Sequence, residues 1–253
     1  MLQTFTLAER PELRRQLWGP QFASSFPEFM NHDPASELYY PPPFLDRYLD
    51  HVLVGVDSDA PDQAIAKGFS VPFCFRDGSE ERAALPEGGW RTVIRWGHED
   101  TIKGRAPNAV SALEISVASG HRGTGLSRRM IDAMRRLVAA KGIDVLYAPV
   151  RPTDKHRVPE EPMEAYIRRL RNDGLPHDNW LRTHLRLGGR IVKVAPCSMV
   201  IAASLATWRG WTGLAFDSEG ALVVPEALAP VHVSLAQDHA VYVEPNVWVE
   251  HPV

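Results

Sequence analysis

One stretch decides the fold of this chain: Leu113-Glu-Ile-Ser-Val-Ala-Ser-Gly-His-Arg-Gly-Thr-Gly-Leu-Ser127. Its first residues continue an apolar run, and the segment Ala109–Val117 has the pattern that predicts a β-strand. A turn with glycines follows. From Leu126 onward, apolar side chains recur at helical spacing with arginines opposite, which predicts an amphipathic helix ended by Gly142. The stretch therefore predicts a strand, a tight turn and a helix in direct succession.

The turn between this strand and this helix predicts a binding site for phosphate groups. The first amides of a helix have no intrahelical partner and carry the positive end of the helix dipole. Gly123 and Gly125 have no side chains, so phosphate oxygens can approach these amides closely. A P-loop is not indicated because the turn has no lysine. A dinucleotide fingerprint is incomplete, since Arg128 occupies the place of its third glycine.

The segments before and after this unit predict a mixed α/β protein. Residues 52–56 and 63–75 read as a strand hairpin, and residues 90–104 favour a short helix. A strand over 143–150, directly after the central helix, predicts parallel pairing with the strand before that helix. Residues 1–50 read as helical pieces separated by prolines.

The C-terminal part predicts more helices and strands. A proline-bounded insert, residues 152–176, is expected to carry one helix over 163–172. Asp178 can cap a helix over 179–187, which Gly188 ends. The expected strands are 190–196, 199–204, 221–224, 231–236, 240–243 and 247–249. The fold class expected is α/β: one domain over 1–253 with a twisted mixed sheet, helices on both faces, an N-terminal helical elaboration and extra C-terminal strands.

Composition narrows the classes of partner. Net charge is −3, from 28 basic and 31 acidic side chains, so neither nucleic acid nor an anionic membrane surface is an expected partner. No apolar run approaches the roughly 18 residues of a membrane span. Cys74 and Cys197 have no metal-ligand spacing and the histidines are dispersed, so no metal and a cytoplasmic location are expected.

In this strand–turn–helix context, Arg122-Gly-Thr-Gly125-Leu-Ser127 fits the pattern Arg-x-x-Gly-x-(Gly/Ala). Over about residues 52–196 the chain resembles the GNAT superfamily of acyl-CoA N-acyltransferases. Ser127 departs from the pattern, because it replaces the final glycine or alanine with another small residue. Residues 143–150 resemble the family's fifth strand, which splays from the fourth and leaves a slot for the pantetheine arm.

The resemblance implies transfer of an acyl group, expected to be acetyl from acetyl-CoA, to the amine of a small molecule. It implies direct attack by the neutral amine without an acyl-enzyme intermediate. Strand backbone would pair with pantetheine, a strand amide would polarise the carbonyl, and the turn would hold the pyrophosphate. The cofactor-binding residues expected on this basis are Ile115, Ser116, Val117, Arg122, Gly123, Thr124, Gly125, Leu126, Ser127 and Asn179.

Two side chains are the candidate catalytic residues. His184 falls where the family's Tyr-x-x-Leu-Gly often places a tyrosine that protonates the departing thiolate, and imidazole ordinarily titrates near neutrality. Glu114 is the carboxylate of the key strand and the candidate base. Strand alternation places it opposite Leu113, Ile115 and Val117, so it faces the wrong side unless a β-bulge intervenes. A structural histidine and a salt-bridged glutamate are the alternative interpretations.

Other functions stay open at this point. The main alternative is a non-catalytic acyl-CoA-binding or sensing module that kept the phosphate site. A nucleotide or dinucleotide enzyme is disfavoured by the missing lysine and the missing third glycine. The valine-rich strands of the tail also allow a homodimer through an exposed sheet edge.

Overall fold

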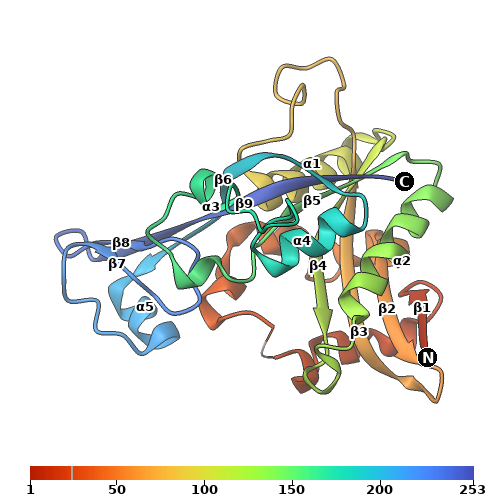
Figure 1. The fold of residues 1–253 in the computed structure, drawn as a ribbon, viewed down its shortest axis with the longest axis horizontal. Coiled ribbons are helices and arrows are strands. Elements are labelled where there is room, and N and C mark those ends of the chain that lie inside the picture. The colour runs from red at the N-terminus through yellow and green to blue at the C-terminus, as the bar shows by residue number, and fades with distance from the viewer. Residues whose placement is uncertain (24) are drawn as a thin grey trace.

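The computed structural model describes residues 1–23 and 25–253. Over these residues one mixed sheet of nine strands has the order β1-β2-β3-β4-β5-β9-β8-β7, with β6 paired to β9 (Figure 1). The strands are β1 (Leu2–Thr6), β2 (Val52–Asp57), β3 (Ala60–Phe73), β4 (Ala109–Val117), β5 (Val145–Val150), β6 (Arg190–Ser204), β7 (Gly220–Leu222), β8 (Val231–Ser234) and β9 (His239–Pro252). The α-helices are α1 (Gly89–Lys103), α2 (Leu126–Ala140), α3 (Met163–Tyr166), α4 (Asn179–Arg186) and α5 (Leu205–Thr212).

In the described part of the chain, six short 3-10 helices lie between β1 and β2, and two more lie in the loops after β4 and after β5. They are η1 (Pro11–Trp18), η2 (Pro20–Phe22), η3 (Glu28–His32), η4 (Pro34–Leu38), η5 (Leu45–Arg47), η6 (Leu49–His51), η7 (Ser119–His121) and η8 (Lys155–Arg157). Prolines stand at the start of several, where a missing N–H costs nothing, and they keep the pieces short.

Helix α2 covers one face of the N-terminal part of the sheet (Figure 1). Met130 and Met134 of α2 lie over the strand glycines Gly55 and Gly68. A Cβ atom at these glycines would come within 3.2 and 3.1 Å of methionine atoms, so glycine leaves the room that the two side chains fill. The arginines expected on the outer face of this helix leave its apolar stripe free to pack on the strands.

Helix α1 and the N-terminal 3-10 segments cover the opposite face, where most of the buried aromatic side chains gather. Tyr39 and Phe69 are fully buried there, and the Tyr39 hydroxyl donates to the carbonyl of Ser70 at 2.8 Å. Gly97 of α1 lies so close to Val71 that a Cβ atom at position 97 would be 2.3 Å from a Val71 methyl carbon. Helices therefore cover both faces, as expected.

Strands β4 and β5 run parallel but soon separate. Among the described residues they pair at Val110↔Leu146 and Ser111↔Tyr147, and no pair follows. The edge of β4 that faces β5 thus has no strand partner after Ser111. The lack of a neighbouring strand leaves room for an extended ligand to pair with the backbone of β4.

Strand β4 also contains a β-bulge. Ala112 lies opposite Ser70 and Glu114 lies opposite Phe69, so Leu113 has no residue opposite it. Ala112 packs in the core under α2, whereas Leu113 packs in the core on the other face. Because of the extra residue, Glu114 follows Leu113 onto that other face, which the strict alternation of a regular strand would not allow.

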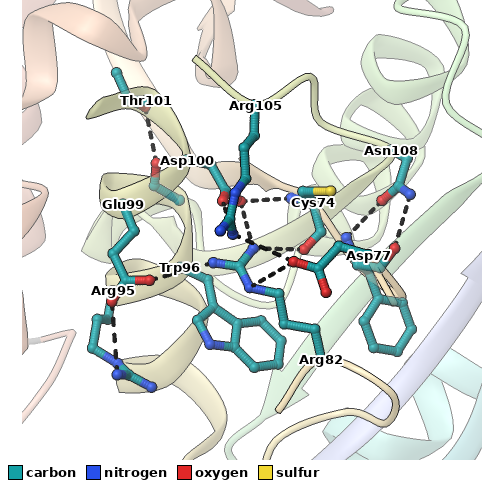
Figure 2. Close-up of polar contacts among 12 residues, drawn as sticks. Cys74, Asp77, Arg82, Arg95, Trp96, Glu99, Asp100, Thr101, Arg105 and Asn108 are labelled. Atoms are coloured by element: carbon teal, nitrogen blue, oxygen red, sulfur yellow. Dashed lines mark hydrogen bonds and ion pairs between the residues drawn. The ribbon is translucent and has the colours of Figure 1, made fainter. Parts of the chain in front are cut away.

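A buried arginine fastens the loop between β3 and α1 (Figure 2). Nη1 of Arg82 donates to the carbonyl of Cys74 and to the carboxylate of Asp100, both at 2.7 Å. Its Nε lies 3.7 Å from the Asp77 carboxylate, and its guanidinium carbon lies 5.0 Å from the ring centroid of Trp96. Since the charge is paired while buried, the cluster stabilises the path of the loop. None of these five residues lines the cavities described below.

The best-predicted elements are confirmed. They include the β2–β3 hairpin, α1, β4, α2 and the parallel β5. Gly142 follows α2 with φ +72°, the left-handed conformation of a helix-ending glycine. The Asp178 side chain accepts from the amides of Trp180 and Leu181 and so caps α4 as predicted.

Three expectations about the C-terminal half are wrong. The helix expected over 163–172 ends at Tyr166, because Leu170 pairs with Pro176 and turns the chain back. The two strands expected over 190–204 are the single strand β6, with an irregularity between Ala195 and Met199. The strands expected at 240–243 and 247–249 are likewise one strand, β9.

Two elements were not expected from the sequence. Strand β1 is a half-exposed edge strand whose residues carry no clear apolar alternation. Helix α5 is short, and its buried residues Leu205 and Trp208 are too few to give a helical pattern. In both cases pairing or packing with distant residues stabilises a segment whose own pattern is weak.

Candidate active site

The turn before α2 has the geometry of an anion site. Gly123 and Gly125 have φ values of +77° and +79°, a conformation that glycine adopts without strain. A Cβ atom at either position would meet nothing within 4 Å, so the space in front of the turn is open. Gly125 is the N-cap of α2, which has no side-chain cap. The first amides of the helix therefore point to open space with the dipole behind them.

A cleft of about 710 Å³ begins at this turn and follows the free edge of β4. The end of β5 and the helix α4 form the opposite wall. The predicted residues that line the cleft are Glu114, Ile115, Ser116, Val117, Arg122, Gly123, Gly125, Leu126, Ser127, Asn179 and His184. Thr124 does not line it, and its hydroxyl donates to the carbonyl of His121 at 2.6 Å, which braces the turn.

Basic side chains outnumber acidic ones along the cleft. Its arginines are Arg122, Arg128, Arg151 and Arg186, and its carboxylates are Glu114 and Glu226. An elongated ligand with phosphate groups at one end and an extended amide-bearing arm fits this combination of charge, helix terminus and free strand edge.

A second cavity, of about 480 Å³, opens from the other side of β4. Aromatic side chains make up much of its wall: Trp18, Phe22, Phe26, Tyr40 and Trp90. The residues common to cleft and cavity include Leu113, Glu114, Pro149 and Arg151, which come from the bulge of β4 and the end of β5. The two spaces therefore meet where β4 and β5 separate.

Glu114 lies at this junction and is held by two partners. Its Oε1 lies 3.0 Å from the Lys67 ammonium and accepts from the Ser116 hydroxyl at 2.7 Å. Lys67 in turn donates to the carbonyl of Leu17 at 2.9 Å. The bulge at Leu113 thus brings the candidate base to the junction, and the salt bridge named as its alternative interpretation is also present.

A second carboxylate network closes the cavity from β9. Glu244 is fully buried, lies 3.0 Å from Nε of Arg151 and accepts from Asn246 at 3.0 Å. The Tyr242 hydroxyl also donates to it at 2.8 Å. Burial, and next the charge of Glu244, raise the pKa of Tyr242 well above its usual value, so this phenol stays protonated. The network holds Arg151 at the wall shared by both spaces.

His184 lies in the wall of the cleft on α4, almost fully buried. Its Nδ1 is 2.8 Å from Nε2 of His251, and its ring meets Trp180 edge to face at 4.6 Å. Burial, and next the neighbouring His251, lower the pKa of His184 to about 3. The expectation that this imidazole titrates near neutrality is therefore wrong, and the ring is neutral at pH 7.

Several residues of the site escaped the sequence-based prediction. Lys67, Glu244 and His251 contact predicted residues or line the two spaces, yet they lie on the strands β3 and β9, far from the central motif in the sequence. A weak signal exists at β9, where the polar Glu244 interrupts a valine-rich run and is buried. Among the described residues no group of three or more histidine, cysteine or acidic side chains forms a metal site, and no helix is long and apolar enough to cross a membrane.

No family model matches the sequence. A relative does: the arginine N-acetyltransferase avaD of Aspergillus versicolor is 34% identical over 275 residues, which cover 98% of this chain and 93% of the relative. The chain belongs to the GNAT superfamily. It is an acyl-CoA-dependent N-acetyltransferase, and a non-catalytic binding module is set aside. Its substrates are a coenzyme A thioester and an amine, as in the other GNAT acetyltransferases.

Solved structures agree on the GNAT fold at low sequence identity. The loading GNATL domain of CurA from Lyngbya majuscula superposes with a TM-score of 0.57 at 14% identity, covering 100% of this chain and 98% of that one. The GphF GNAT-like decarboxylase in complex with isobutyryl-CoA gives 0.51 at 14% identity, with coverage of 100% and 98%. The expected fold class, a mixed sheet with helices on both faces, is confirmed.

Proposed function

We propose that this GNAT enzyme transfers acetyl from acetyl-CoA to a cationic small-molecule amine, with arginine as the first candidate acceptor. One observation carries the proposal: the basic cleft and the aromatic cavity meet at the Glu114 carboxylate. Donor and acceptor bound in the two spaces would bring thioester and amine together at that carboxylate. Holding both reactants in one geometry removes much of the entropic barrier of a bimolecular step.

The donor occupies the cleft in this proposal. The amides of the turn, Arg122 through Ser127 and including Thr124 through its main chain, hold the pyrophosphate. The free edge of β4 over Ile115, Ser116 and Val117 pairs with the pantetheine arm, and Asn179 contacts the arm from α4. An amide of β4 near the bulge would donate to the thioester carbonyl as charge develops on its oxygen.

The chemistry then needs one proton acceptor and one group to stabilise sulfur. The amine nitrogen attacks the thioester carbon, and the Glu114 carboxylate takes the proton that the nitrogen loses. The C–S bond breaks, the electron pair leaves with sulfur, and His184 donates a hydrogen bond from its neutral ring to the thiolate. Because the His184 ring is neutral at pH 7, it acts as a hydrogen-bond donor and not as an imidazolium acid.

The acceptor occupies the second cavity. Its lining contains the carboxylates of Glu37, Glu114 and Glu244, and the cations Lys67 and Arg151 pair with the last two. Glu37 has no ion pair among the described residues and is exposed. A guanidinium or ammonium group of the acceptor supplies the positive charge that pairs with Glu37, and it packs on the aromatic wall. This combination favours a cationic amine, in keeping with the relative named as an arginine N-acetyltransferase.

The test is thiol release from acetyl-CoA in the presence of amines, followed by mass spectrometry of the product. We expect arginine to be acetylated, and amines of similar length without a positive charge to react far more slowly. Glu114→Gln is expected to lower kcat on the order of 10²-fold while acetyl-CoA affinity stays unchanged. Product formed equally well from neutral amines, or full activity of Glu114→Gln, would contradict the proposal.

We also propose that residues 1–253 act as one acyltransferase domain, because strands from residue 2 to residue 252 join one sheet. A cytoplasmic location is proposed with it, supported by the two free cysteines Cys74 and Cys197. A homodimer through the edge strand β7 stays a proposal that light scattering decides, since a monomer at working concentration would exclude it.

A further inference from the structure

We propose that His251 is a positioning residue that fixes the tautomer of His184, so that His184 presents an N–H and not a lone pair to the donor cleft. This inference rests on the proposed function, in which His184 stabilises the departing thiolate. It assigns a role to a histidine on β9 that lies outside the acyl-CoA motif.

The two rings face each other directly. Nδ1 of His184, on α4, lies 2.8 Å from Nε2 of His251, on β9. Burial lowers the pKa of His184 to about 3, with the neighbouring His251 as the second cause. It lowers the pKa of His251 to about 4, with Arg135 as the second cause. Both rings are therefore neutral at pH 7, and each carries one N–H and one lone pair. The contact has only two arrangements, because one nitrogen donates and the other accepts.

Arg135 of α2 selects between these arrangements. It donates to the carbonyl of Leu187 at 3.1 Å and to that of Pro252, next to His251, at 2.8 Å. Its Nε and the Nδ1 of His251 are both buried without a hydrogen-bond partner among the described residues. A guanidinium has donors only, and its charge acts on His251, so a lone pair on Nδ1 is favoured over a second N–H.

The proton of His251 therefore resides on Nε2 and donates to Nδ1 of His184. His184 must then carry its own proton on Nε2, the ring nitrogen that has no partner among the described residues. This nitrogen is buried in a ring that lines the cleft, and its N–H is the donor that we assign to a thiolate formed there. No covalent bond to hydrogen breaks in this role, because the neutral imidazole stabilises the sulfur by hydrogen bonding alone.

The packing around the pair keeps the two rings in this relation. Trp180 holds the His184 ring edge to face. Gly189 lies so close to His251 that a Cβ atom there would be 2.6 Å from Cε1 of the ring. Glu250, the other neighbour of His251, pairs with Arg190 and so does not supply a competing acceptor. The tautomer is set by Arg135 and transmitted through one hydrogen bond.

Nitrogen-15 NMR of the full chain with labelled histidine tests the tautomer directly, because protonated and unprotonated ring nitrogens have well-separated shifts. The signals are assigned by their loss in His184→Gln and His251→Gln. We expect a protonated Nε2 and an unprotonated Nδ1 on both rings. A protonated Nδ1 on His184 would overturn the inference, whatever the activity of the enzyme.

Kinetics provide the second readout. His251→Leu removes the donor but keeps the volume, and we expect kcat to fall by about tenfold or more, with KM for acetyl-CoA unchanged. The loss cannot exceed that of His184→Ala, on the order of 10²-fold. His251→Gln restores a donor and should recover most of the activity, and in a His184→Ala background His251→Leu should have no further effect. The matched control is His232→Leu, at an exposed histidine of β8.

Failure of the proposed role of His184 in the reaction can be distinguished from failure of the inference about His251. Full activity of His184→Ala would remove the proposed role of His184 in the reaction, while the NMR result still decides whether His251 fixes the tautomer. An additive loss in the double variant would instead show that His251 acts on activity without His184 and would overturn the inference. If His251→Leu does not fold, the wild-type spectrum and His251→Gln decide the matter.

Discussion

Replacing Gly125 by aspartate is the sharpest test of the donor site. The open space at this position receives the new side chain without a steric clash, since a Cβ atom meets nothing within 4 Å. The carboxylate then lies in front of the amides that are proposed to hold pyrophosphate. It both repels the phosphates and caps the helix in their place.

The size of the effect follows from this placement. Two unit charges about 5 Å apart at an effective dielectric constant of about 20 repel by about 3 kcal/mol, and salt reduces this further. With about 1.4 kcal/mol per tenfold, acetyl-CoA affinity should fall by about 10²-fold. The left-handed backbone at φ +79° costs aspartate about 1 kcal/mol of stability, a cost that affects folding more than binding.

Calorimetric titration of acetyl-CoA into the wild type and Gly125→Asp measures this loss. Gly142→Asp is the matched control: it has φ +72°, equally open space and the same helix, but lies at the opposite end of α2. S-acetylpantetheine, which has no phosphate groups, should bind both variants alike. Affinity for acetyl-CoA within about twofold of wild type in a folded Gly125→Asp would refute the assignment of the turn.

Three further predictions concern acceptor binding, the buried Arg82 and the pH dependence of stability. Glu37→Gln should raise KM for arginine about fivefold, roughly 1 kcal/mol, with kcat unchanged; steady-state kinetics decide, and an equal effect on a neutral amine would contradict the charge argument. Arg82→Met should lower the free energy of unfolding by about 3 kcal/mol in urea titrations, against less than about 1 for the half-exposed Arg95→Met. The lowered pKa values of His184 and His251, about 3 and about 4, mean that the unfolded chain takes up protons below about pH 6.5 while the folded one does not. Stability should therefore fall from about pH 7 to about pH 5, by roughly 2 kcal/mol per histidine, and an unchanged urea midpoint over this range would contradict the burial of the pair.

The strand–turn–helix unit could be predicted because its signals are local. Apolar spacing, the two turn glycines and the helix-ending Gly142 all act within a few residues of one another. The same holds for Asp178, whose carboxylate caps the helix that follows it at once. Local signals thus predicted the glycine turn at the start of the cleft and most of the central sheet.

The acceptor side could not be predicted in this way. Lys67 reaches Glu114 through the pairing of β3 with β4, and Arg151 reaches Glu244 only because β5 pairs with β9. The position of Glu114 itself depends on a β-bulge, and no residue type in the sequence predicts a bulge at this place. The tautomer of His184 likewise depends on a partner that is 67 residues away. These contacts depend on which distant strands pair with each other, and a single sequence does not show that pairing.

The bulge at Leu113 gives β4 an unequal tolerance to changes of length. Deleting Leu113 would leave a regular strand in which Ala112 and Ile115 still face α2 and Glu114 still faces the cavity. Inserting one residue at the same place would also restore regular alternation and keep Glu114 on the cavity face, but it would move Glu114 along β3, from opposite Phe69 to opposite Lys67. Among variants of this enzyme that differ by one codon here, those that lost it keep the register of β4 against β3, whereas those that gained one must shift it.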